Sequence, residues 1–214
     1  MMENTLVLLL AYLVGSVPFG YLAGKMNGID LREHGSKNIG ATNTFRVLGK
    51  KWGIPVFICD VLKGFFPVLL MKTHLGAELT GCTTAEMGWL IGTLMAAVLG
   101  HTFTCFLKFK GGKGIATALG ALIAFSPLIA GVALAAWLAC MICTRYVSLS
   151  SIIAALAVEA STLWLCVDDA VFSGSDAIMF GFISLLVVLV IVKHRSNVSR
   201  LLNGTEPKAF SKKK

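Results

Sequence analysis

Residues 115–143 read IATALGALIAFSPLIAGVALAAWLACMIC, an apolar run without a charged side chain. A helix needs roughly 20 apolar residues to cross the hydrocarbon core of a membrane, so this run is longer than one crossing and short for two. Ser126 and Pro127 stand near its middle, where proline removes a backbone donor and favours a break. The run therefore predicts a hairpin of two short helices at 115–143.

The remainder of the chain also has the composition of a membrane protein. Its 214 residues are 56% hydrophobic and only 14% charged, whereas soluble domains carry roughly 25% charged residues. The mean hydropathy is +0.80. Together with the hairpin, these runs predict an all-α polytopic membrane helical bundle of about seven helical segments, in one domain over residues 1–214. The other spans are expected at about 5–22, 53–71, 87–106, 148–167 and 177–193.

The distribution of basic residues predicts the orientation of the bundle. If residues 115–143 enter the membrane and return, nearly all basic residues lie on one side, which the positive-inside rule makes cytoplasmic. Only Lys63, within a span, and Lys72, at an outer end, are exceptions. The N-terminus is then outside and the C-terminus cytoplasmic. The basic groups outside the hairpin are 23–52, 106–114, Arg145 and the tail 193–214.

The first polar segment, residues 35–46, reads GSKNIGATNTFR. Its glycines let backbone N–H groups approach a ligand closely, and such concave arrangements of N–H groups bind anions. Arg46 is able to bind a phosphate with two parallel hydrogen bonds. The alternative is a turn-rich connector between two spans.

The lysine segment, residues 108–114, reads KFKGGKG and follows Gly100-His101-Thr102-Phe103. Three lysines around a diglycine, at the start of an expected helix, suggest an anion at a helix N-terminus. The pattern is not a Walker A loop, which needs Gly at position 107 and Ser or Thr at position 114. The alternative is a positively charged membrane anchor.

Two further polar segments flank the last two spans. Ser148 or Ser150 is placed to cap the helix that follows residues 144–147. On a helix leaving the membrane, His194, Asn197 and Arg200 would line one face at i, i+3 spacing, and a solvated amphipathic helix end is the alternative. All four polar segments together predict a ligand with one or more phosphates at the inner membrane surface.

Ionisable residues within spans are costly and are candidates for function. Asp60 and Lys63 stand three residues apart on one helical face and can neutralise each other, either in a functional or in a purely structural pair. Glu159 has no local partner in the sequence. The C-x-x-C at Cys140 and Cys143 lies in an apolar helix without a second pair, so no metal site is expected.

The polar segments resemble the signature motifs of the bacterial acyl-phosphate:glycerol-3-phosphate acyltransferases, an integral membrane family. The resemblance runs from GSVPFG at 15–20 to RLLNGTE at 200–206, and GATN at 40–43 and FKGGKG at 109–114 are its most specific parts. The family usually has Gly where this chain has Lys37, and Pro where it has Thr104.

The resemblance implies transfer of a fatty acyl group from acyl phosphate to the 1-hydroxyl of glycerol 3-phosphate, which gives lysophosphatidic acid and phosphate in phospholipid biosynthesis. It implies a bacterial cytoplasmic (inner) membrane enzyme whose partners are glycerol 3-phosphate, acyl phosphate and membrane lipid, with no cofactor, metal or nucleic acid. Acyl-CoA and acyl carrier protein are then not donors. The soluble-type enzymes carry His-x-x-x-x-Asp, and no histidine of this chain has Asp five residues on.

The resemblance also implies roles for individual residues, while leaving open which segment binds which substrate. His194 and Asn197 would orient the attacking hydroxyl, with His194 or the departing phosphate taking its proton. Ser148, Ser150 and Arg200 would contact substrate. The phosphate ligands would be Ser36, Asn38, Thr42, Asn43 and Arg46 in one group and Lys110, Gly111, Gly112 and Lys113, the last also catalytic, in the other.

Two other classes of protein are compatible with parts of the sequence. A transporter of an organic phosphate would explain the intramembrane charges and the broken helix, but the polar residues gather on one face and no inverted repeat is evident. A phosphotransferase acting on a nucleotide-activated lipid would need clustered acidic metal ligands. Only Asp30, Glu33 and Glu206 are candidates for these, and they are far apart.

Overall fold

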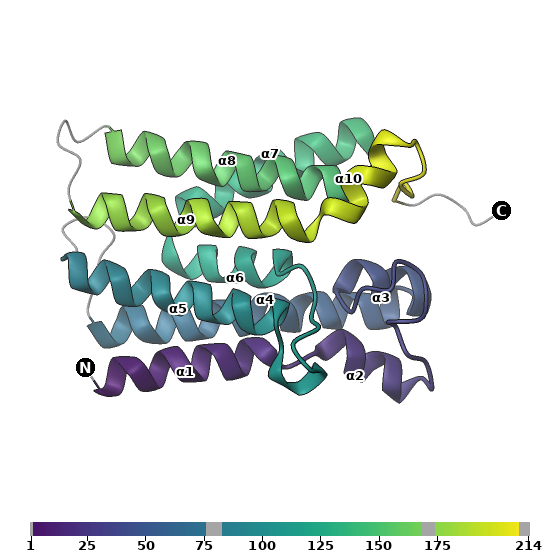
Figure 1. The fold of residues 1–214 in the computed structure, drawn as a ribbon, viewed down its shortest axis with the longest axis horizontal. Coiled ribbons are helices and arrows are strands. Elements are labelled where there is room, and N and C mark those ends of the chain that lie inside the picture. The colour runs from purple at the N-terminus through teal and green to yellow at the C-terminus, as the bar shows by residue number, and fades with distance from the viewer. Residues whose placement is uncertain (1, 76–82, 168–173, 210–214) are drawn as a thin grey trace. The chain divides into compact units, whose positions relative to one another are not determined.

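The structure, a computed structural model, describes residues 2–75, 83–167 and 174–209. All regular elements in these ranges are helical (Figure 1). Six stretches of the described chain are long and apolar enough to cross a membrane. The prediction of an all-α polytopic bundle is confirmed, and the direction in which the helices cross stays a prediction. The elements are α1 (Met2–Ser16), α2 (Phe19–Met26), α3 (Ala41–Leu48), α4 (Lys50–Leu75), α5 (Thr84–Thr102), the 3₁₀ turn η1 (Cys105–Leu107), α6 (Ile115–Phe125), α7 (Pro127–Thr144), α8 (Val147–Val167), α9 (Gly174–Lys193) and α10 (Arg195–Leu202).

The chain forms two compact units, Met1–Ser126 and Pro127–Lys214. The single domain expected over 1–214 stays a prediction. The basic tail after residue 209 lies outside the described residues.

The boundary between the units is the helix break expected near Ser126 and Pro127. Ser126 is extended, with φ −145° and ψ 103°, and its N–H still donates to the Leu122 carbonyl (2.8 Å). A residue before proline avoids the helical region, and Pro127 is tolerated as the first residue of α7. The break is confirmed. The 11 residues of α6 span roughly 16 Å, too little for a crossing, whereas the 18 residues of α7 are long enough by themselves.

The first span is interrupted, where one continuous helix over about 5–22 was expected. Helix α1 ends at Ser16 and α2 begins at Phe19, because Pro18 has no N–H to continue the helix. Two carbonyls freed by the break accept hydrogen bonds from side chains. Ser16 O accepts from Thr104 Oγ1 (2.6 Å), and Val17 O accepts from Lys63 Nζ (2.8 Å).

Glycines bring the helix backbones of the first unit into direct contact, as small residues do in membrane bundles. A Cβ added at Gly120 of α6 would lie 1.9 Å from the Val61 carbonyl oxygen of α4, and one at Gly64 of α4 would lie 2.0 Å from the Thr117 carbonyl oxygen of α6. Helix α6 is thus held closely against α4, which fixes the position of its N-terminus.

In the second unit α8 packs against both α7 and α9, and α10 contacts the ends of α8 and α9. Glu159 of α8, for which the sequence offered no local partner, accepts a hydrogen bond from Ser184 of α9. The partner lies on a different helix, which is why sequence spacing could not identify it.

Candidate active site

The junction between α1 and α2 anchors both polar segments of the first unit. Thr104, which bonds to the end of α1, begins the stretch that leads to the lysine segment. On the other side, a Cβ added at Gly20 would lie 1.8 Å from the Ile39 carbonyl oxygen of the first polar segment. Both segments therefore lie at the same end of this unit, where α5 ends and α4 begins (Figure 1).

Asn43 organises the backbone of the first polar segment. Its side chain is only 1% exposed, and its Oδ1 accepts a hydrogen bond from the Ser36 N–H (2.8 Å). The Asn43 amide is thus engaged by main-chain groups, and its direct contact with substrate stays a prediction. Its Nδ2 donates at 2.8–3.2 Å to the carbonyls of Leu31, His34 and Asn38.

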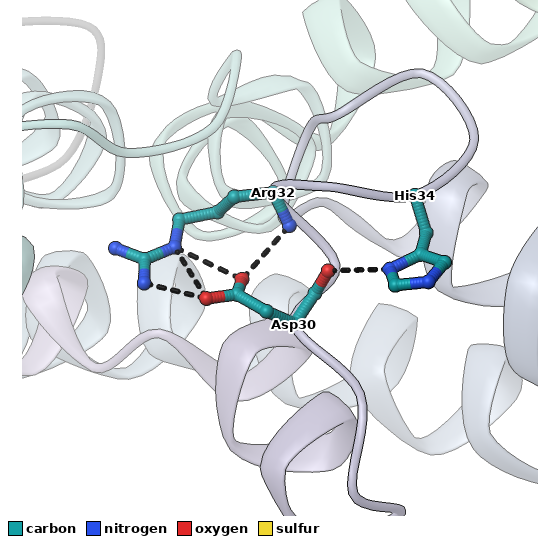
Figure 2. A network of polar contacts seen from close by, with 3 residues as sticks. All are labelled: Asp30, Arg32 and His34. Atoms are coloured by element: carbon teal, nitrogen blue, oxygen red, sulfur yellow. Dashed lines mark hydrogen bonds and ion pairs between the residues drawn. The ribbon is translucent and has the colours of Figure 1, made fainter.

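The turn before this segment is fixed by a polar network around Asp30 (Figure 2). Arg32 Nη2 lies 2.6 Å from Asp30 Oδ2, and His34 Nδ1 lies 2.9 Å from the Asp30 carbonyl oxygen. The hydrogen bonds from Arg32 lower the pKa of Asp30 to about 2. The Asp30 carboxylate, an acidic candidate in the phosphotransferase alternative, is therefore occupied by Arg32.

The second half of the first polar segment is helical rather than a simple connector. Asn38 Oδ1 accepts from the Gly40 N–H (2.8 Å), and α3 begins directly after Gly40. Thr42 and Arg46 lie four residues apart, on one exposed face of α3. Ser36 is also exposed. These hydroxyls and the guanidinium are donors suited to phosphate oxygens.

Lys37, where the family usually has glycine, has a left-handed backbone with φ 58°. This region costs a residue with a Cβ about 1–2 kcal/mol, while glycine adopts it freely. Lys37→Gly is therefore expected to raise the free energy of unfolding by up to about 1 kcal/mol, after the loss of unfolded-state constraint. Thermal unfolding in detergent measures the change. Lys37→Ala removes the charge but keeps the strain and is the matched control; a lower Tm for the glycine variant than for it contradicts the interpretation.

In the lysine segment, Gly111 and Gly112 lie directly on the end of α5. The Gly111 N–H donates to the Thr102 carbonyl (3.1 Å) and the Gly112 N–H to the His101 carbonyl (3.0 Å). A Cβ at Gly112 would lie 2.1 Å from His101 Nε2, so only glycine allows this approach. The two N–H groups already donate to carbonyls of α5. Their predicted contact with phosphate is not tested by these bonds and stays a prediction.

The cationic groups of this segment surround the start of α6. Lys110 is exposed and Lys113 is half-buried. Gly114, with φ 80°, is the residue before α6 and provides no side-chain cap. The first N–H groups of a helix have no partner within the helix and carry a partial positive charge. Lys110, Lys113 and these N–H groups together form the cationic set expected for a phosphate.

In the second unit, His194 has a defined ring orientation. The ring is 2% exposed, and its Nδ1 lies 2.8 Å from the Val190 carbonyl oxygen. A carbonyl only accepts, so Nδ1 carries the hydrogen and the neutral ring has its lone pair on Nε2. His194 thus has the tautomer of a general base at Nε2.

Glu206 binds three of the predicted site residues. Its Oε1 accepts from Ser148 Oγ (2.6 Å) and Asn197 Nδ2 (2.7 Å). Its Oε2 accepts from Arg200 Nε (2.7 Å). Glu206 therefore holds together α8, α10 and the segment after α10. Asn197 and Arg200 do share one side of α10, as their spacing predicted.

The balance of charge and burial favours ionised Glu206. Burial is the largest influence and raises the pKa of Glu206, but the hydrogen bonds from Ser148, Asn197 and Arg200 together outweigh it. The pKa of Glu206 is therefore below its ordinary value.

Neither serine caps α8, so the capping interpretation was wrong. A capping oxygen accepts from a helix N–H, whereas Ser148 Oγ donates to Glu206 and Ser150 Oγ donates back to the Tyr146 carbonyl (2.9 Å). Both serines are buried. Their contact with substrate stays a prediction.

Glu206→Ala is expected to lower the free energy of unfolding of the second unit by about 3 kcal/mol, because it leaves the buried Ser148 and Asn197 donors without their acceptor. The loss depends on pH. With its pKa lowered by folding, Glu206 stabilises the protein fully above about pH 4.5, and this stabilisation disappears as the pH falls through the lower folded value. Thermal unfolding of both proteins between pH 3 and 7 measures the difference, which should shrink toward low pH. Glu33→Ala, which removes an exposed acid, is the control, and a difference independent of pH contradicts the role.

Sequence reasoning missed Glu206 and His101 as parts of these clusters. The signal for Glu206 was the Asn203-Gly204 pair, because Gly204 has φ 66° and turns the chain back so that the Thr205 N–H bonds to the Arg200 carbonyl (2.8 Å). His101 carried no signal, since its partner Asp60 belongs to another helix.

Comparison with known proteins gives one consistent family. Residues 5–204 match the family model described as glycerol-3-phosphate acyltransferase. A glycerol-3-phosphate acyltransferase of Synechocystis is 46% identical over 96% of this chain and 90% of its own length. One of Bacillus cereus is 42% identical over 100% of this chain and 99% of its own.

Solved structures agree with the sequence relatives. The crystal structure of PlsY (YgiH), an integral membrane glycerol 3-phosphate acyltransferase, in its glycerol 3-phosphate form has a TM-score of 0.84 at 38% identity, covering 96% of this chain and 95% of that one. Its lysophosphatidic acid form has a TM-score of 0.81 at 37% identity, with the same coverage. This protein, with its six membrane-length helical stretches in the described residues, belongs to the glycerol-3-phosphate acyltransferase family.

Proposed function

We propose that this protein transfers a fatty acyl group from acyl phosphate to the 1-hydroxyl of glycerol 3-phosphate, giving 1-acyl-glycerol 3-phosphate and inorganic phosphate. Family membership supports the acceptor and the reaction type. Acyl phosphate as the acyl donor is supported by the two segments rich in hydrogen-bond donors at one end of the first unit. Two phosphorylated substrates require two such groups.

The chemistry of acyl phosphate suits these residues. Acyl phosphate is a mixed anhydride with a good leaving group, so positioning and stabilisation of negative charge lower most of the barrier. In the first unit, Ser36, Thr42 and Arg46 supply one set of donors. Lys110, Lys113 and the first N–H groups of α6 supply the other. Both sets are cationic and rich in N–H or O–H donors, as phosphate oxygens require.

The second unit supplies the groups for the hydroxyl. The hydroxyl oxygen attacks the acyl carbonyl carbon, the bond from that carbon to the phosphate oxygen breaks, and phosphate leaves with the electron pair. His194 Nε2 has the lone pair to take the hydroxyl proton. Asn197, held by Glu206, orients the hydroxyl. The hydroxyls of Ser148 and Ser150 already donate hydrogen bonds within the protein. They can therefore only accept hydrogen bonds from glycerol 3-phosphate.

The proposal places the enzyme in the bacterial cytoplasmic membrane with its polar segments toward the cytoplasm. Nearly all basic residues then lie on the side that the positive-inside rule assigns to the cytoplasm. Glycerol 3-phosphate is met on that side, and the product leaves into the adjoining leaflet. The transporter alternative is set aside, because the family is one of acyltransferases.

One assay tests the reaction and its donor. Purified protein receives labelled glycerol 3-phosphate together with acyl phosphate, acyl-CoA or acyl carrier protein loaded with the same chain. The expected result is labelled 1-acyl-glycerol 3-phosphate with acyl phosphate only. Labelled product with acyl-CoA and none with acyl phosphate refutes the donor, and no product with any donor refutes the reaction.

A further inference from the structure

Three ionisable side chains are buried together in the first unit, outside the groups assigned to substrates. Asp60, Lys63 and His101 are 2%, 4% and 6% exposed. Lys63 Nζ lies 2.7 Å from Asp60 Oδ1, and His101 Nδ1 lies 3.6 Å from the same oxygen. The sequence identified the Asp60–Lys63 pair but left its role open, either functional or purely structural.

The cluster is connected to the lysine segment through His101. The His101 carbonyl accepts the Gly112 N–H, and the ring lies where a Cβ of residue 112 would be. A Cβ at Gly111 would likewise lie 2.0 Å from the His101 carbonyl oxygen. The diglycine thus packs on this one histidine, whose Nδ1 lies 3.6 Å from Asp60 Oδ1.

The cluster is also connected to the first polar segment through Lys63. Its ammonium donates to the Val17 carbonyl (2.8 Å) and lies 5.4 Å from the centre of the Phe19 ring, so it holds the α1–α2 junction. Gly20 of this junction contacts the first polar segment. A single buried cluster therefore supports both segments.

Burying three ionisable side chains within a membrane-spanning unit is costly, which makes them candidates for function. Taking ions out of water costs several kcal/mol each, and an apolar pair of equal volume is often as stable. An apolar pair would leave the Val17 carbonyl with only the Phe19 N–H as its donor (3.2 Å) and would remove the carboxylate beside the His101 ring.

We propose that Asp60, Lys63 and His101 are positioning residues of the acyl transfer, which fix the diglycine and thereby direct Lys113 and the start of α6 at the substrate phosphate. This inference rests on the proposed function. Lys63 contacts Asp60 and the Val17 carbonyl, and the His101 ring lies beside Gly112, so the cluster acts on substrate only through the lysine segment.

A double-mutant cycle tests the linkage from Asp60 to His101. His101→Phe keeps a ring against Gly112 but loses the polar contact, and Asp60→Asn removes the charge. Each is expected to lower kcat/KM at least tenfold, through a higher KM for one substrate. Inorganic phosphate should also inhibit each variant more weakly than the wild type. The double variant should be no more than about threefold worse than the poorer single variant, since both break one linkage. Multiplying effects, or a fall in kcat at unchanged KM for both substrates, overturn the proposal.

Conservative replacement separates positioning from mere folding. Lys63→Arg keeps a cation with N–H donors for Asp60 and the Val17 carbonyl and is expected to remain within about threefold of the wild-type kcat/KM, while Lys63→Met loses at least tenfold. Equal activities of the two variants overturn the role of Lys63.

Hydrogen exchange in the full-length protein supplies a measurement that needs no activity. In Asp60→Asn, the amides of residues 108–114 should exchange at least tenfold faster, with exchange in α8 and α9 unchanged. Glu159→Gln removes another ionisable residue from a span and is the matched control, expected to leave residues 108–114 unchanged. Unchanged exchange in Asp60→Asn overturns the proposal. If exchange is faster in Asp60→Asn and the wild-type protein makes no acyl-glycerol 3-phosphate, the positioning of the segment is upheld and the proposed function is rejected.

Discussion

Lys113→Ala is expected to lower kcat/KM for acyl transfer by about 100-fold or more, the cost of removing one preorganised donor from developing negative charge. Lys113 is half-buried directly before Gly114, where α6 begins without a side-chain cap. Its ammonium and the partial positive charge of the helix N-terminus are proposed to act on the same anion. Alanine leaves the helix end but removes the full charge. Steady-state kinetics with each substrate varied in turn measure the loss.

Lys50→Ala is the matched control for this prediction. Lys50 is an exposed cation at the start of α4 and belongs to neither donor group, so kcat/KM should stay within about threefold, as for most surface changes. Arg46→Ala should also lose activity, because the guanidinium on the exposed face of α3 is the main cation proposed for the other phosphate. Near wild-type kcat/KM in both Lys113→Ala and Arg46→Ala would remove the phosphate roles of both groups.

His194→Asn is expected to lower kcat by about 100- to 10,000-fold, the usual contribution of general-base catalysis, with little change in KM. Asparagine has an amide N–H that can replace Nδ1 as the donor to the Val190 carbonyl, so the end of α9 keeps its hydrogen bond. It has no basic nitrogen to take the place of Nε2. The substitution therefore removes the proposed base and keeps the hydrogen bond to Val190.

The pH profile of kcat separates two proton acceptors. If His194 takes the proton, the wild-type rate falls toward low pH as the ring becomes protonated, and this fall is absent in the asparagine variant. If the departing phosphate takes the proton, both proteins keep the same profile and kcat changes little. An unchanged Tm in detergent shows that the variant is folded.

The class of fold and the helix break at Pro127 were readable from the sequence, because hydropathy and proline act over short distances. The apolar runs predicted the spans, and Pro127 marked the boundary between α6 and α7. Pro18 interrupts the first span by the same mechanism, but it lay inside a run long enough for a crossing, so the run length prevailed in the prediction. Resemblance contributed the reaction, which residue chemistry alone limited to a phosphorylated ligand at the membrane surface.

The assignment of contacts within the polar segments could not be read from spacing. The amide of Asn43 has four main-chain partners among residues 31–38, which its spacing did not predict, and its role toward substrate stays a prediction. The N–H groups of Gly111 and Gly112 bond to the end of α5, and their role toward phosphate likewise stays a prediction. The residue types indicated the chemistry of these segments but not the direction in which their polar groups point.

The sequence by itself determined that this chain is a helical membrane protein with its cations and glycines in a few short segments, since composition and periodicity are local properties. Only the tertiary structure decided which of these residues meet. Ser148 and Glu206 are 58 positions apart and share a hydrogen bond, and Asp60 meets His101 from a neighbouring helix. Such pairs form because buried polar groups must find partners wherever packing places them, and packing is a property of the whole folded unit.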